Sequence, residues 1–187
     1  MTFEESLIEH CSPTLAGMKV ASLYRYSPGD SRQFGLQYKL WREWFARLGL
    51  KLVILKGCRE TGSYLLYLYR EDALRRLLAR PDVCGYLSCL DYDPGAGHRA
   101  LLRQLARRLC LEREFPHEIG IFLGYPLADV QGFIQNKGRN YTCCGCWKSY
   151  GDPRIARRRF NRYRACTAFY KRRYAGGTPI TQLIKAA

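Results

Sequence analysis

Hydrophobic and polar residues follow helical spacing in some stretches of the chain and strand-like alternation in others. Residues 3–10 predict a short helix that Cys11-Ser12-Pro13 breaks, and residues 16–26 predict a strand. Residues 32–48 predict a longer helix. Its apolar stripe consists of Phe34, Tyr38, Trp41, Phe45 and Leu48.

Two β-rich runs follow, at residues 51–58 and 62–70, and a short polar link containing glycine joins them. Strands joined in this way predict an antiparallel hairpin. Downstream of the hairpin the spacing predicts three helical segments, at residues 71–80, 82–90 and 96–113.

The remainder of the chain predicts a helix, a turn and a second helix over residues 115–138, and then a cysteine-rich strand. Asp152 as N-cap and Pro153 at the first position open a long helix that Gly176-Gly177 ends. A short helix is expected at residues 179–186.

These elements predict an α+β fold, a small and mostly antiparallel sheet of about three to four strands covered by many helices. The chain has 187 residues, which suits a single domain over residues 1–187. The basic C-terminal helical segment 152–187 is expected to pack on that domain.

The composition of the chain indicates the cellular compartment in which we expect the protein. No apolar run approaches the ~18 residues of a membrane span, so no membrane partner is expected. The N-terminus lacks the pattern of a secretory signal, and a cytoplasmic location is therefore expected. In that compartment the nine cysteines should be mostly free thiols.

The positive charge is concentrated in one part of the chain. The formal net charge is +15, and the stretch from Lys137 to Arg173 holds twelve lysines and arginines with a single acid, Asp152, which is +11. Such asymmetry indicates either an anionic partner or a solvated helix face. Both interpretations stay open.

The cysteine-rich stretch contains a C-x-x-C from Cys143 to Cys146. A redox C-x-x-C needs a helix N-terminus at its first thiol, but the next helix begins only at Pro153. A structural zinc site needs four ligands, and no fitting second pair is present. We therefore predict no cofactor and no metal, with the thiols packed as small hydrophobic groups in a strand. A metal- or redox-linked site using Cys143, Cys144 and Cys146 remains an alternative, in which Cys143 and Cys146 would be the ligands.

A first candidate for chemistry surrounds Cys11, which lies between a predicted helix and a predicted strand. In this hypothesis Cys11 is a nucleophile, His117 its general base and Glu118 the group that orients the base. His10 and Lys19 would favour the thiolate. The alternative is a buried structural cysteine.

A second candidate is the segment 117–136, whose apolar spacing and turn glycine Gly124 fit a helix-turn-helix. Its second helix would present Ala128, Asp129, Gln131, Gly132 and Gln135 outward. An αα-hairpin that packs on the sheet explains the same spacing without DNA.

A third candidate is the basic helix 154–174. Its apolar stripe, which should face the core, consists of Ala156, Phe160, Tyr163, Thr167, Tyr170 and Tyr174. Arg154, Arg158 and Arg162 follow one another at i, i+4 and i+8 along one row. That row would bind anions, including the phosphates of nucleic acid.

Three motifs, HCSPTLAGMK (10–19), FPHEIGIFLGYPLADVQGFIQNKG (115–138) and NYTCCGCWKSYGD (140–152), resemble the bacterial domain-of-unknown-function family 3793. The resemblance covers nearly the whole chain and implies a small cytosolic bacterial protein, but no reaction. The family motifs contain His10, Cys11, Pro13, Lys19, His117, Glu118, Gly124, Gly138, Trp147, Lys148 and Tyr150.

The leading functional hypothesis is a thiol-based pocket, catalytic or binding a small molecule, in which Cys11 and His117 share a cleft. The expected binding residues are His10, Lys19, Trp147, Lys148 and Tyr150. The alternative is a nucleic-acid-binding module that uses the segment 117–136 and the basic helix 154–174.

Overall fold

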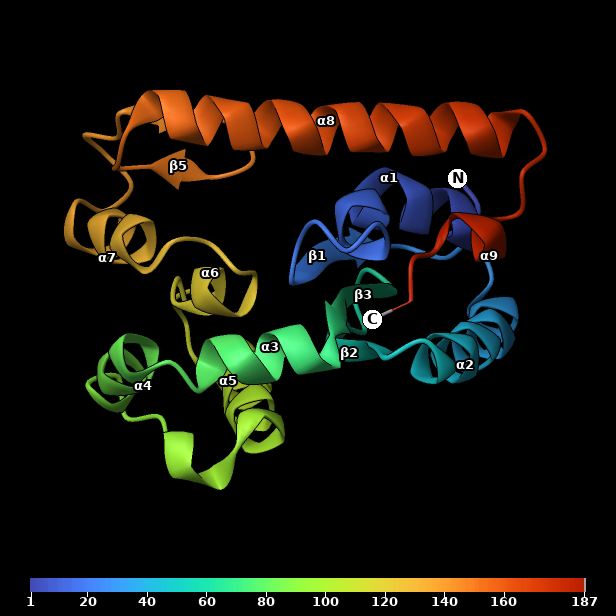
Figure 1. Cartoon of the computed structure of the whole chain (residues 1–187). Helices are drawn as coiled ribbons and strands as arrows, with labels where there is room; N and C mark the ends of the chain where they lie inside the picture. Colours follow the sequence, from blue (N-terminus) through green and yellow to red (C-terminus); the bar gives the residue numbers. More distant parts are fainter. Residues whose placement is uncertain (187) are drawn as a thin grey trace. The chain divides into compact units, whose positions relative to one another are not determined.

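The computed structural model describes residues 1–186 and confirms an α+β fold, with a three-stranded antiparallel sheet and a separate two-stranded hairpin (Figure 1). The chain divides into two compact units. The first comprises Met1–Ala73 and the chain from Cys166 onward, and the second comprises Leu74–Ala165. The single domain expected from the sequence stays a prediction, and each unit is described by itself.

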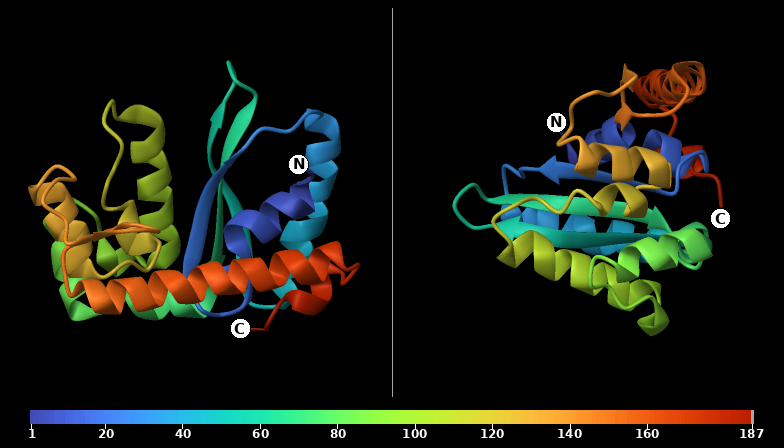
Figure 2. Two further views of the ribbon diagram at one scale, coloured as in Figure 1. Left: turned by 90° about the horizontal axis from the view of Figure 1, so that it is seen from above. Right: turned by 90° about the vertical axis from the view of Figure 1, so that its left-hand side faces the viewer.

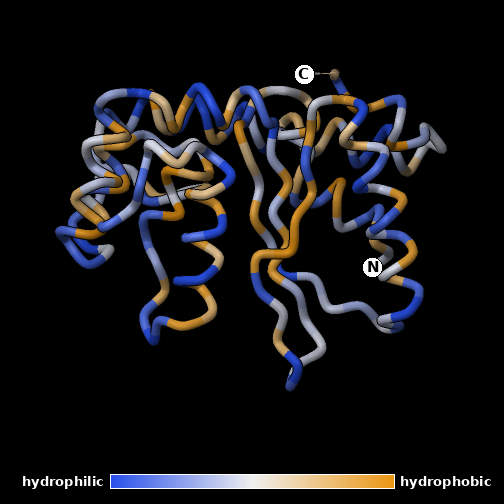
Figure 3. The backbone as a smooth tube through the Cα atoms, turned by 90° about the horizontal axis from the view of Figure 1, so that it is seen from below, coloured by the Kyte–Doolittle hydropathy of each residue, from blue (hydrophilic) through white to orange (hydrophobic). Residues whose placement is uncertain are grey.

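The sheet of the first unit contains β1 (Ala21–Tyr26), β2 (Leu50–Cys58) and β3 (Ser63–Arg70), in the order β1-β3-β2. β2 and β3 form the predicted hairpin, and both pairings of β3 are antiparallel. Figure 3 shows these strands as mainly hydrophobic, with a hydrophilic tip where the hairpin turns. The expected strand from residue 16 begins only at Ala21, because Gly17 adopts a φ of +77° and makes a turn.

One face of this sheet forms the core of the first unit with helices α1 (Phe3–Leu15) and α2 (Ser31–Arg47). Alternate strand residues point to this face because side chains alternate along a strand. The strand residues that belong to this core are Tyr24, Tyr26, Leu50, Leu52, Leu66 and Leu68. The predicted stripe of α2 is confirmed, since Phe34 and Phe45 are buried and Tyr38, Trp41 and Leu48 pack against the same core.

Helix α1 is longer than expected, because Pro13 lies inside its last turn instead of breaking it. Proline removes the hydrogen bond to the carbonyl four residues earlier, that of Glu9. Glu9 is exposed, so water can satisfy that carbonyl. At the other end, Thr2 and Glu5 form a capping box that satisfies two free N–H groups.

The buried side chain of Arg70 ties the end of α1 to the C-terminal segment. Its Nε donates to the carbonyl of Thr14 at 2.8 Å, and its Nη2 donates to the carbonyls of Leu15 at 2.8 Å and Lys185 at 2.6 Å. The last carbonyls of a helix have no partner within the helix. Gly17, with a φ of +77°, already caps α1, because the N–H groups of Gly17 and Met18 donate to the carbonyls of Thr14 and Pro13. Arg70 adds a charged donor at the same end.

The second unit is mostly helical. Its elements are α3 (Glu71–Leu78, which begins in the first unit), α4 (Pro81–Ser88), the 3-10 helix η1 (Pro94–Ala96), α5 (His98–Leu111), α6 (Ile119–Phe122), α7 (Leu127–Gln135), β4 (Cys143–Cys144) and β5 (Lys148–Ser149). The helices agree with the predictions, although α6 has only one turn. The predicted cysteine-rich strand is instead a tight antiparallel hairpin of β4 and β5.

The long basic helix α8 (Pro153–Ala175) is continuous and supplies residues to both units (Figure 2). The backbone N–H of Arg154 donates to the side chain of Asp152 at 2.8 Å, as expected for an N-cap. Gly177, with a φ of +83°, follows the helix, and α9 (Ile180–Leu183) comes next. No helix among residues 1–186 is both long enough and apolar enough to span a membrane.

Replacing Arg70 with methionine should destabilise the protein by about 3 kcal/mol, because three charge-assisted hydrogen bonds are lost, although the carbonyls of Thr14 and Leu15 keep backbone donors. Urea unfolding measures the loss. Arg76→Met on the exposed side of α3 is the control and should change stability by less than ~0.5 kcal/mol. Equal stability of the two variants would contradict the role of Arg70 in tying the end of α1 to the C-terminal segment.

Candidate functional site

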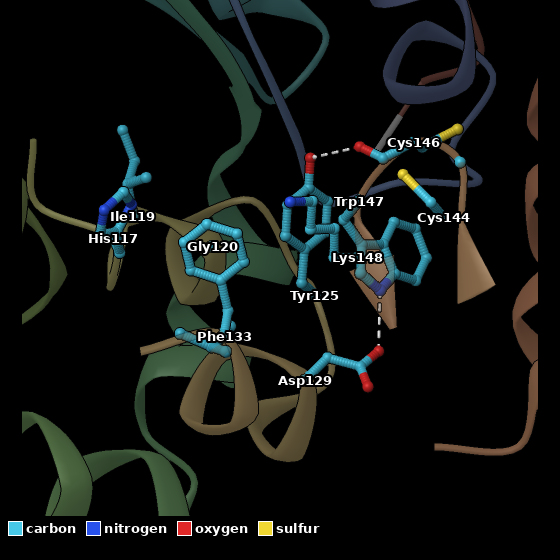
Figure 4. A pocket seen from close by; sticks show the side chains of 12 residues that line it. His117, Ile119, Gly120, Tyr125, Asp129, Phe133, Cys144, Cys146, Trp147 and Lys148 are labelled. Carbon is cyan, nitrogen blue, oxygen red and sulfur yellow. Dashed lines mark hydrogen bonds between the residues drawn. The ribbon is translucent and has the colours of Figure 1, made fainter. Parts of the chain in front are cut away.

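A pocket of about 340 Å³ lies in the second unit, between the α6–α7 segment and the β4–β5 hairpin (Figure 4). Twelve residues line it: His117, Ile119, Gly120, Tyr125, Asp129, Val130, Phe133, Cys144, Gly145, Cys146, Trp147 and Lys148. All of them belong to the second unit. The pocket combines aromatic and aliphatic walls with a few polar groups, as ligand pockets do.

Asp129 in the first turn of α7 holds the hairpin in place. Its Oδ2 accepts a hydrogen bond from Trp147 Nε1 at 2.7 Å, which Figure 4 shows. Its Oδ1 accepts from Ser149 Oγ at 3.1 Å, from the N–H of Tyr150 at 2.7 Å and from the N–H of Gly151 at 3.2 Å. Four donors satisfy this buried carboxylate, which would otherwise be costly to bury.

Two glycines allow the hairpin to approach its neighbours closely. A Cβ on Gly132 of α7 would lie 2.5 Å from Cγ of the Tyr150 ring. A Cβ on Gly145, at the hairpin turn, would collide with the ring of Phe160 from α8. The Tyr150 ring therefore rests on the backbone of α7, the Phe160 ring rests on the backbone of the hairpin turn, and the pocket wall has little room to move.

Trp147 forms the aromatic wall of the pocket. Its ring stacks on Tyr125 with centroids 4.7 Å apart and meets the edge of Phe160 at 4.6 Å. The guanidinium of Arg159 lies 5.9 Å from the Trp147 ring centroid, within the range of a cation–π contact. Burial raises the pKa of Tyr125 to about 12, so its hydroxyl stays protonated and donates to the carbonyl of Cys146 at 3.4 Å.

His117 and Lys148 lie around Phe133 and make a polar region of the pocket. The ring centroids of His117 and Phe133 are 4.8 Å apart, and Lys148 Nζ lies 5.8 Å from the Phe133 centroid. Lys148 also donates to the carbonyl of Gly138 at 2.8 Å and lies 5.0 Å from the ring centroid of Tyr141. Within residues 1–186 no carboxylate forms a salt bridge with Lys148.

Several residues proposed from the sequence meet in this pocket: His117, Trp147 and Lys148 line it together. Tyr150 lies beside it, with its ring over Gly132 and its hydroxyl donating to the carbonyl of Arg139 at 2.9 Å. Sequence reasoning missed Tyr125 and Phe133 as pocket residues, although both lie in a motif that the sequence singled out.

Glu118 does not point toward the role proposed for it. Its Oε1 accepts a hydrogen bond from the Tyr92 hydroxyl at 2.9 Å and from Arg108 Nη1 at 3.2 Å. Neither bond involves His117, which has only ring contacts with Phe115 and Phe133 among the described residues. The carboxylate of Glu118 therefore serves the packing of α5 against the segment that follows it.

Cys11 is fully buried in the core of the first unit. Burial raises the pKa of this thiol to about 12, against the opposing effects of Lys19 and Ser22. His10 is exposed at the surface and stacks on Tyr24, with ring centroids 4.7 Å apart. These features are those of a structural thiol, and the cleft shared by Cys11 and His117 stays a prediction that the proposals below do not use.

The structure corrects the helix-turn-helix interpretation of residues 117–136. Asp129 and Gly132 were expected to face outward from the second helix, but both are buried. The reason is that β5 and Tyr150 pack on that face of α7. The αα-hairpin alternative describes the segment better, and α7 cannot present that face to a DNA groove.

The three clustered cysteines have different surroundings. Cys143 is buried beside Phe160 and Ala156, as the packed-thiol prediction expects, whereas Cys144 and Cys146 are exposed and line the pocket. In the part of the chain that the structure describes, no group of three or more histidine, cysteine, aspartate or glutamate side chains is arranged to hold a metal ion. The metal alternative therefore has no ligand set in these residues.

The comparisons with known proteins agree with the motifs quoted above. The family model described as "Protein of unknown function (DUF3793)" matches residues 7–184. The chain belongs to this family. Neither the comparison with curated proteins nor that with solved structures gives a match. Because the family has no established activity, the function has to be argued from the geometry of the site.

Replacing Asp129 with asparagine should destabilise the protein by about 3 kcal/mol. The amide group turns one acceptor into a donor, and all four partners of Asp129 are donors. Urea unfolding checks this loss, and Asp91→Asn at an exposed position is the matched control. If both variants unfold at the same urea concentration as the parent, Asp129 does not hold the hairpin.

Iodoacetamide at pH 8 should alkylate Cys144 and Cys146 in the native protein but Cys11 only after unfolding. The reason is exposure, and in addition the raised pKa of Cys11 leaves almost no thiolate at that pH. Peptide mass spectrometry over a time course gives the rate at each cysteine. Labelling of native Cys11 as fast as Cys146 would contradict its placement in the core.

Proposed function

We propose that the pocket of the second unit binds a small organic anion with a planar, apolar body. The observation that carries this proposal is the ammonium group of Lys148, which lies in a largely apolar pocket without a carboxylate partner among the described residues. A charge in such a place is favourable when a ligand supplies the opposite charge.

The sign of the ligand charge follows from the hydrogen bonds that Asp129 and Lys148 already form with the protein. Asp129 accepts four hydrogen bonds, so little of its capacity remains for a cationic ligand. Lys148 makes one hydrogen bond to protein, although an ammonium group has three N–H donors. A carboxylate or phosphate can therefore bind Lys148, and His117 can add a further donor from the same region.

The shape and size of the ligand follow from the walls. Ile119, Val130 and Phe133 offer apolar surface, and aromatic faces favour a flat partner. A volume of about 340 Å³ lies at the small end of the range for ligand pockets. A ligand with one or two rings fits this volume better than a nucleotide cofactor.

A thiol-dependent activity at the same pocket is a second candidate. Cys144 and Cys146 favour it, because both are exposed free thiols that line the pocket. This candidate keeps the thiol chemistry expected from the sequence but replaces Cys11 with residues of the hairpin turn. It predicts that a bound ligand slows the alkylation of both thiols.

Fluorine NMR of protein labelled with 5-fluorotryptophan tests the binding proposal directly. The chain has three tryptophans, and Trp41 and Trp44 in the first unit serve as internal controls for Trp147. Titration with benzoate, 2-naphthoate and indole-3-acetate should shift the Trp147 resonance and leave the other two unchanged. The neutral 2-naphthamide should bind at least about tenfold more weakly than 2-naphthoate, because it lacks a charge-assisted hydrogen bond.

Lys148→Met should abolish the preference for 2-naphthoate over the amide. Lys137→Met is the matched control, since Lys137 is exposed and does not line the pocket. The proposal is contradicted if none of the three acids shifts the Trp147 resonance. It is also contradicted if the parent protein binds 2-naphthoate and 2-naphthamide with equal affinity.

A further inference from the structure

The half of α8 that belongs to the second unit, Pro153–Ala165, is densely basic. It holds six arginines and no acid, and the residue directly before it is the acid Asp152. Asp152 already pairs with Arg154, with Nη2 and Oδ2 3.3 Å apart. One of the six charges is thus neutralised locally.

Four of the arginines form no salt bridge in the described part of the chain. The side chains of Arg157, Arg158, Arg162 and Arg164 are all exposed, and none of them forms a salt bridge or side-chain hydrogen bond with any of residues 1–186. The pKa of the Asp152 carboxyl is lowered by hydrogen bonds from Arg154 and, through its charge alone, by Arg158. Arg159 differs, because it is half-buried and lies over the ring of Trp147. We call the four unpaired residues the arginine face.

The packing of α8 fixes the direction of Arg158 and Arg162, whereas Arg157 and Arg164, seven residues apart, lie together on one flank of the helix. Ala156 and Phe160 are buried against the β4–β5 hairpin, so the opposite side of the helix is turned to solvent. Arg158 and Arg162 lie on that side with Arg154, since residues four apart share a helix face. The three Cα positions span about 12 Å at 1.5 Å per residue. Like charges at this spacing repel one another unless a polyanion binds them.

We propose that the arginine face binds the phosphate backbone of nucleic acid without reading its sequence. Guanidinium groups match phosphate geometry with two parallel hydrogen bonds, and this helix carries eight arginines and one lysine. A duplex presents about seven phosphate charges over ~12 Å, so a row of arginines finds partners in any register. The proposal does not depend on the pocket.

Two other anionic surfaces fit these observations less well. A helix that lies on a membrane needs a broad apolar face directed at the lipid. In Pro153–Ala165, Phe160 is buried and Ile155 is the one large aliphatic side chain that is exposed, which is too little for such a face. An acidic protein presents separate carboxylates that would have to match the spacing of the arginines one by one. Sequence reading is not expected either, because β5 and Tyr150 cover one face of α7.

Fluorescence anisotropy with labelled duplex DNA and single-stranded RNA of unrelated sequences tests the proposal on the full chain. Four phosphate contacts predict a slope of about −3.6 for log K against log salt, or a loss of about 150-fold in affinity to duplex between 50 and 200 mM salt. Affinities for duplexes of different sequence should agree within about threefold. No binding at 20 mM salt, or a strong preference for one sequence, would overturn the proposal.

A quadruple variant in which Arg157, Arg158, Arg162 and Arg164 are changed to glutamine should lose at least about tenfold in affinity at 50 mM salt. The matched control changes Arg76, Arg103, Arg107 and Arg113 to glutamine, which removes the same charge from exposed positions of the same unit. Circular dichroism confirms that both variants fold. If the quadruple variant unfolds, the single substitution Arg158→Gln replaces it. This variant should reduce the magnitude of the slope of log K against log salt by about one.

Two further probes separate the class of polyanion. Poly-glutamate stands in for an acidic protein, and vesicles of phosphatidylglycerol and phosphatidylcholine stand in for a membrane. Both should bind at least about tenfold more weakly than duplex DNA at the same charge concentration and salt. Equal losses in the two quadruple variants, or tighter binding to either probe than to DNA, would overturn the assignment of the arginine face to nucleic acid.

Discussion

The candidate site depends on one buried carboxylate. Asp129 accepts four hydrogen bonds, and every donor comes from the short stretch between Trp147 and Gly151. A two-stranded hairpin this short has little stability of its own. The carboxylate fixes it on α7, and fixing it sets the position of the Trp147 ring that forms one pocket wall. Removal of the carboxylate leaves four donors to compete for water in a buried place.

The same arrangement explains why positive charge is left over in the second unit. Asp129 and Glu118, its buried acids, are both engaged by hydrogen bonds from neighbouring side chains or backbone. Lys148 at the pocket and the arginine face of α8 therefore form no salt bridge with an acid among the described residues. The two regions suit different anions. The pocket has room for a small ligand, whereas the exposed arginines of α8 can contact a long polyanion. The two proposals can accordingly fail or succeed separately.

Local pattern predicted most of the fold, because α2, the β2–β3 hairpin and α8 each carry their own periodicity and end signals. The predicted helix break at Pro13 is wrong. The effect of a proline on a helix depends on whether water can reach the carbonyl that loses its hydrogen bond, here that of Glu9, and a sequence does not show this. The candidate site was predicted only in part. Trp147 and Lys148 came from motif membership, and His117 also came from the thiol hypothesis. Asp129 was expected to face outward because the helix-turn-helix template placed it there, but it is buried. Asp129 can be buried because its hydrogen-bond donors lie about twenty residues further along the chain. Partners at that distance leave no local pattern in the sequence.

Hydrogen exchange at the backbone amides of Tyr150 and Gly151 tests the central role of Asp129 most directly. Both N–H groups donate to its Oδ1, at 2.7 and 3.2 Å. We expect both amides to be strongly protected in the parent protein and to lose that protection in Asp129→Asn, while the amide of Leu105 in α5 stays protected in both. Rapid exchange of Tyr150 and Gly151 in the parent protein, or protection that survives the substitution, would show that the carboxylate does not hold the hairpin.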